Sequence, residues 1–134
     1  MRLIRSFACV AAFATLASCG NPTAPNPLGD WGGTHVALTL TPTGGTAEYD
    51  CAHGSVIEPV RVDADGSFDA RGTFVLEHGG SIRIDETLPT FPARYAGFIV
   101  GDVMTLTVTR TDSAIAIGTF SLQRGGQARV VKCL

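Results

Sequence analysis

No stretch of this 134-residue sequence places apolar residues at a 3.6-residue period over three turns, the pattern of an amphipathic helix. Beyond the first twenty residues, no apolar run approaches the ~20 residues that a membrane-spanning helix needs. Basic residues are not in excess, with 10 Lys and Arg against 12 Asp and Glu. Because nucleic-acid-binding domains carry clustered positive charge, we expect no nucleic acid among the partners. These absences favour a domain built from strands.

The sequence also has little that points to a catalytic or metal-binding site. His78 precedes two glycines, as in some oxyanion segments, but no Gly-x-Ser-x-Gly turn accompanies it. The spacing of His35, His53 and His78 matches no metal-ligand pattern. Cys51 and His53 offer a thiol and a base, but a disulfide would consume the thiol. We therefore expect no enzymatic activity, no cofactor and no metal.

The first residues have the features of a secretory signal. Arg2 and Arg5 precede an apolar run over residues 7–16, which is too short to span a bilayer as a stable helix. Leu-Ala-Ser-Cys follows at residues 16–19 and resembles the lipobox of bacterial lipoproteins. The resemblance implies a signal peptide over residues 1–18 and acylation of Cys19, which becomes the mature N-terminus. The alternative is an ordinary signal peptide that happens to contain a cysteine.

The residues after Cys19 indicate a short tether between anchor and domain. Gly20, rather than an aspartate, follows Cys19, and in envelopes with two membranes the lipoprotein pattern then implies sorting to the outer membrane. Residues 19–28 contain three prolines and polar spacers, which form a semi-rigid tether rather than part of a core. The membrane is therefore an expected partner through the lipid anchor, and residues 29–134 are the expected folded domain.

Two cysteines remain available in the folded domain. Cys9 lies in the signal peptide and Cys19 carries lipid, which leaves Cys51 and Cys133. An even pair of cysteines in an oxidising compartment predicts a disulfide. Two free buried thiols, or half of a metal site, are the alternatives.

Short alternating segments separated by Gly, Asp and Pro dominate residues 29–134, which is the pattern of an all-β domain. About eight sequential strands with short turns predict a small antiparallel up-and-down barrel, with a β-sandwich as the alternative. Gly72, Gly97 and Gly118 fall at strand centres, where a glycine indicates a bend or the close approach of another backbone. The expected strands cover residues 34–41, 46–51, 59–62, 68–76, 81–85, 93–100, 103–109, 114–122 and 128–133.

The start of the domain adds a resemblance to a family of barrels. Gly-Asp-Trp at residues 29–31, at the entry to the first expected strand, resembles the Gly-x-Trp of calycins, the lipocalin-like and avidin-like barrels. The resemblance implies that Trp31 packs across the barrel floor beneath an arginine from the last strand. Arg129 occupies that place in this sequence. The chain departs from lipocalins in lacking the long helix before the last strand.

A second resemblance concerns the membrane-bound type of periplasmic lysozyme inhibitor, which is also a lipoprotein with a compact barrel. Residues 49–54, Tyr-Asp-Cys-Ala-His-Gly, are similar to the early Tyr-x-Cys segment of those proteins, and Cys133 suits their late cysteine. Residues 92–95 occupy the place of the inhibitory loop, without its Ser-Gly. The resemblance implies a binding site at Arg94 and Tyr95.

Three functions therefore stay open. The first is a non-catalytic, envelope-anchored module that binds a protein partner or has a structural role, and the second is lysozyme inhibition. The third is transport of a small apolar ligand. An inhibitor needs a protruding loop near residues 88–92, whereas a carrier needs an open apolar mouth. We expect a filled interior rather than an open one. The large side chains available to fill it are Tyr49, Phe68, Phe74, Tyr95, Phe98, Met104 and Phe120.

Overall fold

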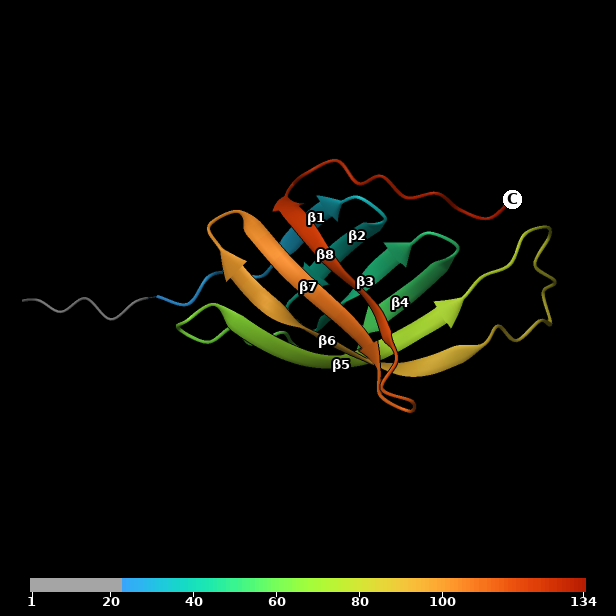
Figure 1. Ribbon diagram of the computed structural model, residues 1–134, viewed down its shortest axis with the longest axis horizontal. Coiled ribbons are helices and arrows are strands. Elements are labelled where there is room, and N and C mark those ends of the chain that lie inside the picture. Colours follow the sequence, from blue (N-terminus) through green and yellow to red (C-terminus); the bar gives the residue numbers. More distant parts are fainter. Residues whose placement is uncertain (1–22) are drawn as a thin grey trace, which may run out of the picture.

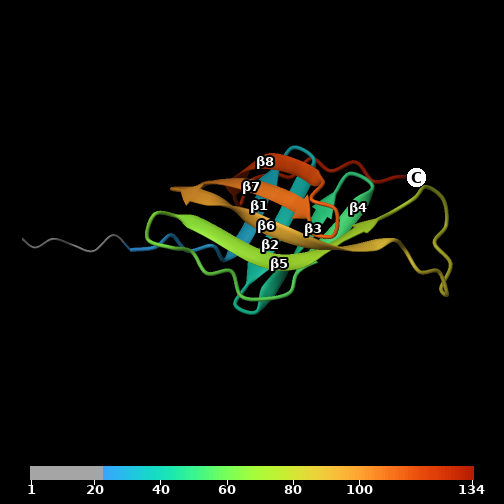
Figure 2. The same ribbon diagram turned by 60° about the horizontal axis from the view of Figure 1, so that its bottom comes forward.

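The computed structural model describes residues 23–134, so the signal peptide and Cys19 lie outside the described residues. The described part is an all-β domain whose eight antiparallel strands follow one another around a closed barrel (Figure 1, Figure 2). Within residues 23–134, no helix is long and apolar enough to cross a membrane. The strands are β1 (Gly29–Gly33), β2 (Val36–Thr41), β3 (Gly44–Tyr49), β4 (Ala52–Val56), β5 (Ser67–Leu76), β6 (Thr90–Val100), β7 (Val103–Arg110) and β8 (Ala116–Arg124).

Alternation along the strands builds the core. In β7, Met104, Leu106 and Val108 are fully buried, while the threonines between them point outward. The same period of two recurs in β2 and β5, because successive side chains leave a sheet on opposite faces. The barrel closes where β1 pairs with β8, from Trp31 opposite Arg124 to Gly33 opposite Leu122. The sequence prediction of an up-and-down barrel is therefore confirmed, and the sandwich alternative is excluded.

Large side chains fill the interior, as the sequence predicts, with one exception. Trp31, Tyr95 and Ile99 are among the largest fully buried side chains. Phe98 was expected inside, but it lies on the outer face of β6 because Ile99, its neighbour, takes the inward position.

Mid-strand glycines make room for the Tyr95 ring. A β-carbon on Gly72 would lie 2.1 Å from the Ser55 carbonyl oxygen and 2.6 Å from the nearer ring carbon of Tyr95. A β-carbon on Gly54, in the neighbouring strand, would lie 2.2 Å from the Tyr95 hydroxyl oxygen. These distances are too short for any side chain, which confirms close approach as the reason for a glycine at residue 72.

Four segments differ from the sequence prediction. Residues 29–33 form a strand, and the next two, Thr34 and His35, make the turn into β2. Residues 52–56 form β4, which pairs with strands on both sides, whereas the expected strand at 59–62 is part of a connection. Residues 81–85 alternate but lie in a loop. Residues 128–133 make one isolated bridge, between Thr34 and Arg129, and no strand.

Residues 125–134, here called the C-terminal strap, cross the outside of β1. A β-carbon on Gly32 would lie 2.1 Å from the Gly126 carbonyl oxygen, so only glycine lets the strap pass at this point. Further along, the Arg129 amide donates to the Gly33 carbonyl (3.0 Å), and the His35 amide donates to the Arg129 carbonyl (2.7 Å). The strap therefore runs from the end of β8 back toward the β1–β2 turn.

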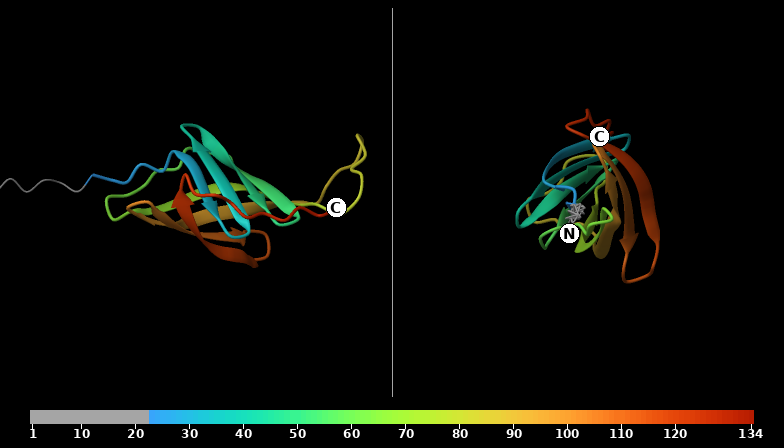
Figure 3. Two further views of the ribbon diagram at one scale, coloured as in Figure 1. Left: turned by 90° about the horizontal axis from the view of Figure 1, so that it is seen from above. Right: turned by 90° about the vertical axis from the view of Figure 1, so that its left-hand side faces the viewer.

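The barrel has two different ends (Figure 3). The tether end holds residues 23–28, the connection over residues 57–66 and the β6–β7 turn. The distal end holds the β5–β6 loop (residues 77–89), the β7–β8 connection and the last residues of the strap. In Figure 1 the β5–β6 loop extends well beyond the barrel on the side opposite the tether.

Candidate functional site at the distal end

The tether end of the barrel is closed by Trp31. This side chain is buried, and its indole Nε1 donates to the Pro27 carbonyl oxygen at 2.8 Å. The Arg124 guanidinium lies over the ring, 4.3 Å from its centre. The prediction of Arg129 at this place is wrong, because β8 ends at Arg124 and Arg129 lies in the strap. The position of Trp31 itself agrees with the expected floor of the barrel.

The distal end has an open recess instead of a closure. Its apolar wall consists of Tyr49, Phe74, Ile117 and Phe120, from strands β3, β5 and β8, and its volume is about 250 Å³. The Tyr49 ring centre lies 5.4 Å from that of Phe74 and 5.7 Å from that of Phe120. Tilted or edge-on rings at this spacing attract one another, so the wall is firmly packed.

The polar rim of the recess comes from His35 and Asp50, whose side chains are joined by a hydrogen bond between His35 Nδ1 and Asp50 Oδ2. The Val131 backbone amide donates to Asp50 Oδ1 at 2.7 Å. That hydrogen bond is the main reason why the pKa of Asp50 lies below its usual value; burial opposes the shift, and His35 adds to it. The rim is therefore anionic at Asp50 and is tied to the strap.

Two tyrosine hydroxyls lie beneath the recess. The Tyr95 hydroxyl donates to the Thr73 carbonyl oxygen at 2.8 Å, and burial raises its pKa to about 12. The Tyr49 hydroxyl is buried without a hydrogen-bond partner among the described residues, and burial is the first cause of its strongly raised pKa. An unpaired buried hydroxyl costs about 1–3 kcal/mol, so the Tyr49 hydroxyl lowers the stability that its ring contributes by packing.

The structure does not bring Arg94 and Tyr95 together as a binding site. Tyr95 points into the barrel and is fully buried. Arg94 points outward and forms an ion pair with Asp69 across the outer face. Neighbouring residues in a strand necessarily face opposite sides of the sheet, so the site inferred from the inhibitor resemblance is wrong for this pair.

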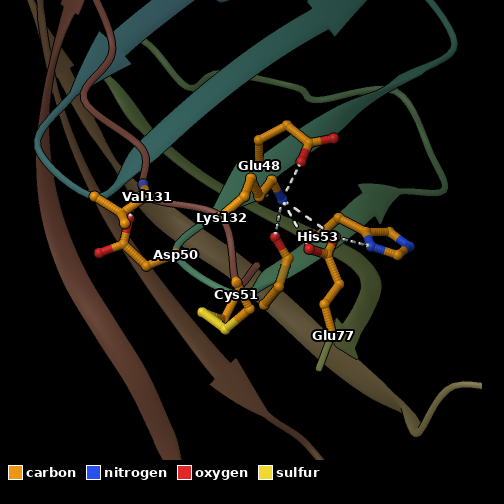
Figure 4. Close-up of polar contacts among 9 residues, drawn as sticks. Glu48, Asp50, Cys51, His53, Glu77, Val131 and Lys132 are labelled. Atoms are coloured by element: carbon orange, nitrogen blue, oxygen red, sulfur yellow. Dashed lines mark hydrogen bonds and ion pairs between the residues drawn. A yellow bond between two sulfur atoms is a disulfide. The ribbon is translucent and has the colours of Figure 1, made fainter. Parts of the chain in front are cut away.

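A polar cluster fastens the strap to the distal end (Figure 4). Lys132 Nζ lies 2.5 Å from Glu48 Oε2 and 3.1 Å from Glu77 Oε1, and it donates to the Ala52 carbonyl oxygen at 2.8 Å. His53 Nδ1 lies 2.7 Å from Glu77 Oε1. Burial acts to raise the pKa of Glu77, but the hydrogen bonds from His53 and Lys132 outweigh it and lower the pKa. Glu77 is therefore charged and links the strap to the start of the β5–β6 loop.

The disulfide expected from the sequence lies beside this cluster. Cys51 and Cys133 are bonded across a sequence separation of 82 residues, with their Cα atoms 4.9 Å apart. The Cys51 amide also donates to the Val131 carbonyl at 3.2 Å. The strap is thus covalently closed onto the β3–β4 turn.

The β5–β6 loop presents apolar residues to solvent. Ile82 and Ile84 are both exposed near its tip. Charged side chains flank them, and His78 Nε2 lies 2.5 Å from Glu86 Oε1 across the base of the loop. The prediction of a strand at residues 81–85 is wrong, and with it the expectation that these isoleucines face a core. Alternation within a segment does not show whether a neighbouring strand is present to pair with it.

Each histidine in the described part of the chain is paired with a carboxylate: His35 with Asp50, His53 with Glu77 and His78 with Glu86. A catalytic histidine of the hydrolase type needs a nucleophile hydrogen-bonded to its second nitrogen. The hydrogen bonds of residues 23–134 include no such pairing with a serine, threonine or cysteine.

Comparisons with protein-family models, with curated proteins and with solved structures find no match to this chain.

The β5–β6 loop should be best ordered in mildly acidic solution. The Gly79 carbonyl and Glu86 raise the pKa of His78 above its ordinary 6.5. The stabilisation of the loop by protonated His78 is therefore complete below pH 6.5 and is lost as the pH rises through the raised pKa. His78, followed by the Arg83 amide, lowers the pKa of Glu86 below its ordinary 4.5, so that contribution is lost as the pH falls through the lowered value. Loop amides should therefore exchange more slowly, after correction for intrinsic rates, between pH 4.5 and 6.5 than at about pH 8.

The matched variant for this measurement is Glu86→Gln. It keeps the shape of the side chain and removes the charge that His78 meets. The pH dependence of exchange in the loop should then be smaller, because only the Gly79 carbonyl still favours protonated His78, while exchange in β7 stays unchanged. An equal pH dependence in the variant would contradict the assignment to this pair.

Proposed function

We propose that this chain is an envelope lipoprotein, held at the outer membrane through acylated Cys19, whose barrel is a non-catalytic binding module that receives an apolar group at its distal end. One observation carries the second part of the proposal. The barrel is closed by Trp31 and Arg124 where the tether leaves, and it is open at the opposite end over Tyr49, Phe74 and Phe120. An anchor at one end and a recess at the other leave the recess facing away from the membrane.

The apolar group is best supplied by a protein partner. The recess, at about 250 Å³, is smaller than the roughly 300–1,000 Å³ of ordinary small-molecule pockets. It suits a single side chain, and the exposed Ile82 and Ile84 of the protruding loop extend the contact area beyond it. Apolar side chains seated in a pocket are the usual centres of protein interfaces.

Two other functions have an observation in their favour. The protruding β5–β6 loop is the feature that lysozyme inhibition requires, and residual lysozyme activity with purified protein and with an Ile84→Asp variant tests it. The apolar wall of the recess is the feature that a carrier of a small apolar ligand requires. The closed barrel with Trp31 at one end is in keeping with the calycin resemblance, which supports the carrier as well.

Anchorage is tested by removing the acyl acceptor. A Cys19→Ala variant should incorporate no labelled fatty acid, because the Cys19 thiol is the proposed site of acylation. Metabolic labelling of a bacterial host followed by immunoprecipitation measures this directly. Label that is equal in the variant and in the unchanged protein would refute the lipoprotein assignment.

The recess is tested with a neutral apolar fluorescent probe, N-phenyl-1-naphthylamine. The probe should bind with a saturable rise in emission, and Ile117→Asp should weaken that binding by roughly tenfold or more, which corresponds to about 1.4 kcal/mol. Ile117 lines the recess, so a carboxylate there meets the probe without a partner. Titration of the probe at constant protein concentration gives the two dissociation constants.

Ile115→Asp is the matched control for the recess. Ile115 is exposed two residues earlier and does not line the recess. Its variant should bind the probe like the unchanged protein. Equal binding by all three proteins would place the probe elsewhere and remove the recess as the binding site.

A further inference from the structure

A second exposed apolar surface lies at the tether end, on the outer face of the β6–β7 hairpin. Phe98, Val100 and Val103 are 49%, 68% and 37% exposed. Val100 and Val103 are cross-strand partners, and Phe98 lies two residues before Val100 on the same face. Ile99, between Phe98 and Val100, already points into the core. Packing of the core therefore does not explain why Phe98 and Val100, which point outward, are apolar. We call these three residues the hairpin patch.

Arg124 fixes the tether directly beside the hairpin patch. Its Nη2 donates to the Asn26 carbonyl oxygen at 2.8 Å and its Nη1 to that of Leu28 at 3.3 Å. The same guanidinium donates through Nε to Asp102 Oδ1 at 3.1 Å, and Asp102 belongs to the turn between Val100 and Val103. One side chain therefore holds the last residues of the tether and the tip of the hairpin together, and Figure 1 shows both at the same end of the barrel.

The covalent chain limits how far the hairpin patch can lie from an anchor at Cys19. Asn26 lies seven positions after Cys19, a distance of at most about 25 Å when the chain is fully extended and about 22 Å in the polyproline conformation. Once Cys19 is anchored, a short connection of this kind raises the effective concentration of the hairpin patch at the membrane to the millimolar range. A patch too weak to bind a membrane alone is then sufficient to orient an anchored domain.

On its β7 and β8 side the hairpin patch borders no uncompensated charge: Asp102 is paired with Arg124, and the outward neighbours are Thr105, Ser121 and Gln123. On the β5 side Phe98 pairs with Ser67, whose hydroxyl donates to Asp65 Oδ1 at 2.7 Å. Because burying an unpaired carboxylate is costly, the hairpin patch has to seat at a depth that leaves Asp65 in water.

From this arrangement we propose that the hairpin patch seats on the lipid surface and holds the barrel upright, with the distal recess facing away from the membrane. This inference rests on the proposed anchorage at Cys19. Lipid is favoured over a protein partner because the tether brings this surface, and not the distal end, within reach of the bilayer. Insertion of apolar side chains at the interface between headgroups and acyl chains is sufficient for such seating.

The experiment compares two tryptophan variants of the lipidated full chain, Val100→Trp and Ile84→Trp, in phosphatidylcholine vesicles that contain a nitroxide-labelled phosphatidylcholine. Trp31 is common to both, so the quenching measured for the unchanged protein is subtracted. Val100→Trp should lose most of its added emission, because its ring enters the lipid interface. Ile84→Trp, at the opposite end of the barrel, should lose almost none.

Vesicle flotation separates the two proposals. If the protein fails to float, the anchorage at Cys19 is wrong. If it floats and the two variants are quenched equally, the seating of the hairpin patch is overturned. A blue shift of Val100→Trp without vesicles, accompanied by a doubled molecular mass, would assign the patch to a second copy of the chain and would also overturn it.

Discussion

Replacing Trp31 with alanine should lower the free energy of unfolding by about 3–5 kcal/mol, the usual cost of truncating a large aromatic side chain in a core. Trp31 is almost completely buried at the tether end of the barrel, and its indole donates a hydrogen bond to Pro27. The variant loses the packing of the ring, leaves a cavity and exposes the Pro27 carbonyl. Urea unfolding followed by far-ultraviolet circular dichroism measures the change, because this signal does not depend on the tryptophan.

The arginine that covers Trp31 gives a matched pair of controls. Arg124→Ala should cost about 0.5–2 kcal/mol, because its guanidinium lies over the ring. Arg129→Ala should change stability by no more than about 0.5 kcal/mol, the usual range for a surface substitution, since its described hydrogen bonds are made by the backbone. A larger loss of stability in Arg129→Ala than in Arg124→Ala would contradict the assignment of Arg124 as the arginine that covers Trp31.

Intrinsic fluorescence provides an independent measurement, since Trp31 is the single tryptophan of the sequence. Emission from the folded protein should be blue-shifted and shielded from acrylamide, because the ring is buried. Red-shifted emission that acrylamide quenches freely would show instead that Trp31 is exposed at the end of the tether.

Local alternation was sufficient to predict the class of the fold. The strand expected at residues 103–109 is β7, Val103–Arg110, and the one expected at 68–76 is β5, Ser67–Leu76. Alternation records which residues face a core, and a barrel and a sandwich both require it. The sequence therefore left the sandwich open, and the choice depends on the long-range pairing of Trp31 with Arg124 between β1 and β8.

Strand prediction failed where pairing, rather than composition, makes the strand. β4 has the sequence Ala-His-Gly-Ser-Val, whose small and polar residues are typical of a turn, yet it pairs with β3 and β5 on both sides. Residues 81–85 show the opposite case. Ile82 and Ile84 alternate like strand residues, but they lie in a loop and remain exposed. A strand's stability comes largely from its neighbours, which the local sequence does not identify.

The candidate site was only partly visible in the sequence. Tyr49, Phe74 and Phe120 were identified as large groups for the interior, but they come from strands far apart in the chain. Only the closure of the barrel brings them around one recess. Lys132, with its contacts to Glu48 and Glu77, was missed for the same reason. The cysteine pair was predictable because, with Cys9 in the expected signal peptide and Cys19 as the expected site of acylation, only Cys51 and Cys133 remain to bond each other.

Removal of the Cys51–Cys133 disulfide should have the second large effect on stability. The free energy of unfolding of the double variant Cys51→Ala/Cys133→Ala should be about 2–4 kcal/mol lower than that of the unchanged protein. For a sequence separation of 82 residues, the loop-entropy relation gives roughly 4–5 kcal/mol as the upper figure. Changing both cysteines leaves neither partner as a free thiol that could form another disulfide. Urea unfolding of the two proteins under non-reducing conditions measures the difference.

The polar cluster around Lys132 provides the control that separates the covalent bond from its surroundings. Lys132→Ala removes the ion pairs to Glu48 and Glu77, whose partly exposed side chains limit the cost to about 0.2–1 kcal/mol. With the disulfide intact, the amide of Cys51 should remain protected from exchange by its hydrogen bond to Val131. In the double cysteine variant, the amide at residue 51 should exchange much faster, because the end of the strap is then held only by hydrogen bonds and ion pairs. If instead the double variant keeps that protection and unfolds like the unchanged protein, the hydrogen bonds of the strap alone hold it, and the disulfide contributes little to stability.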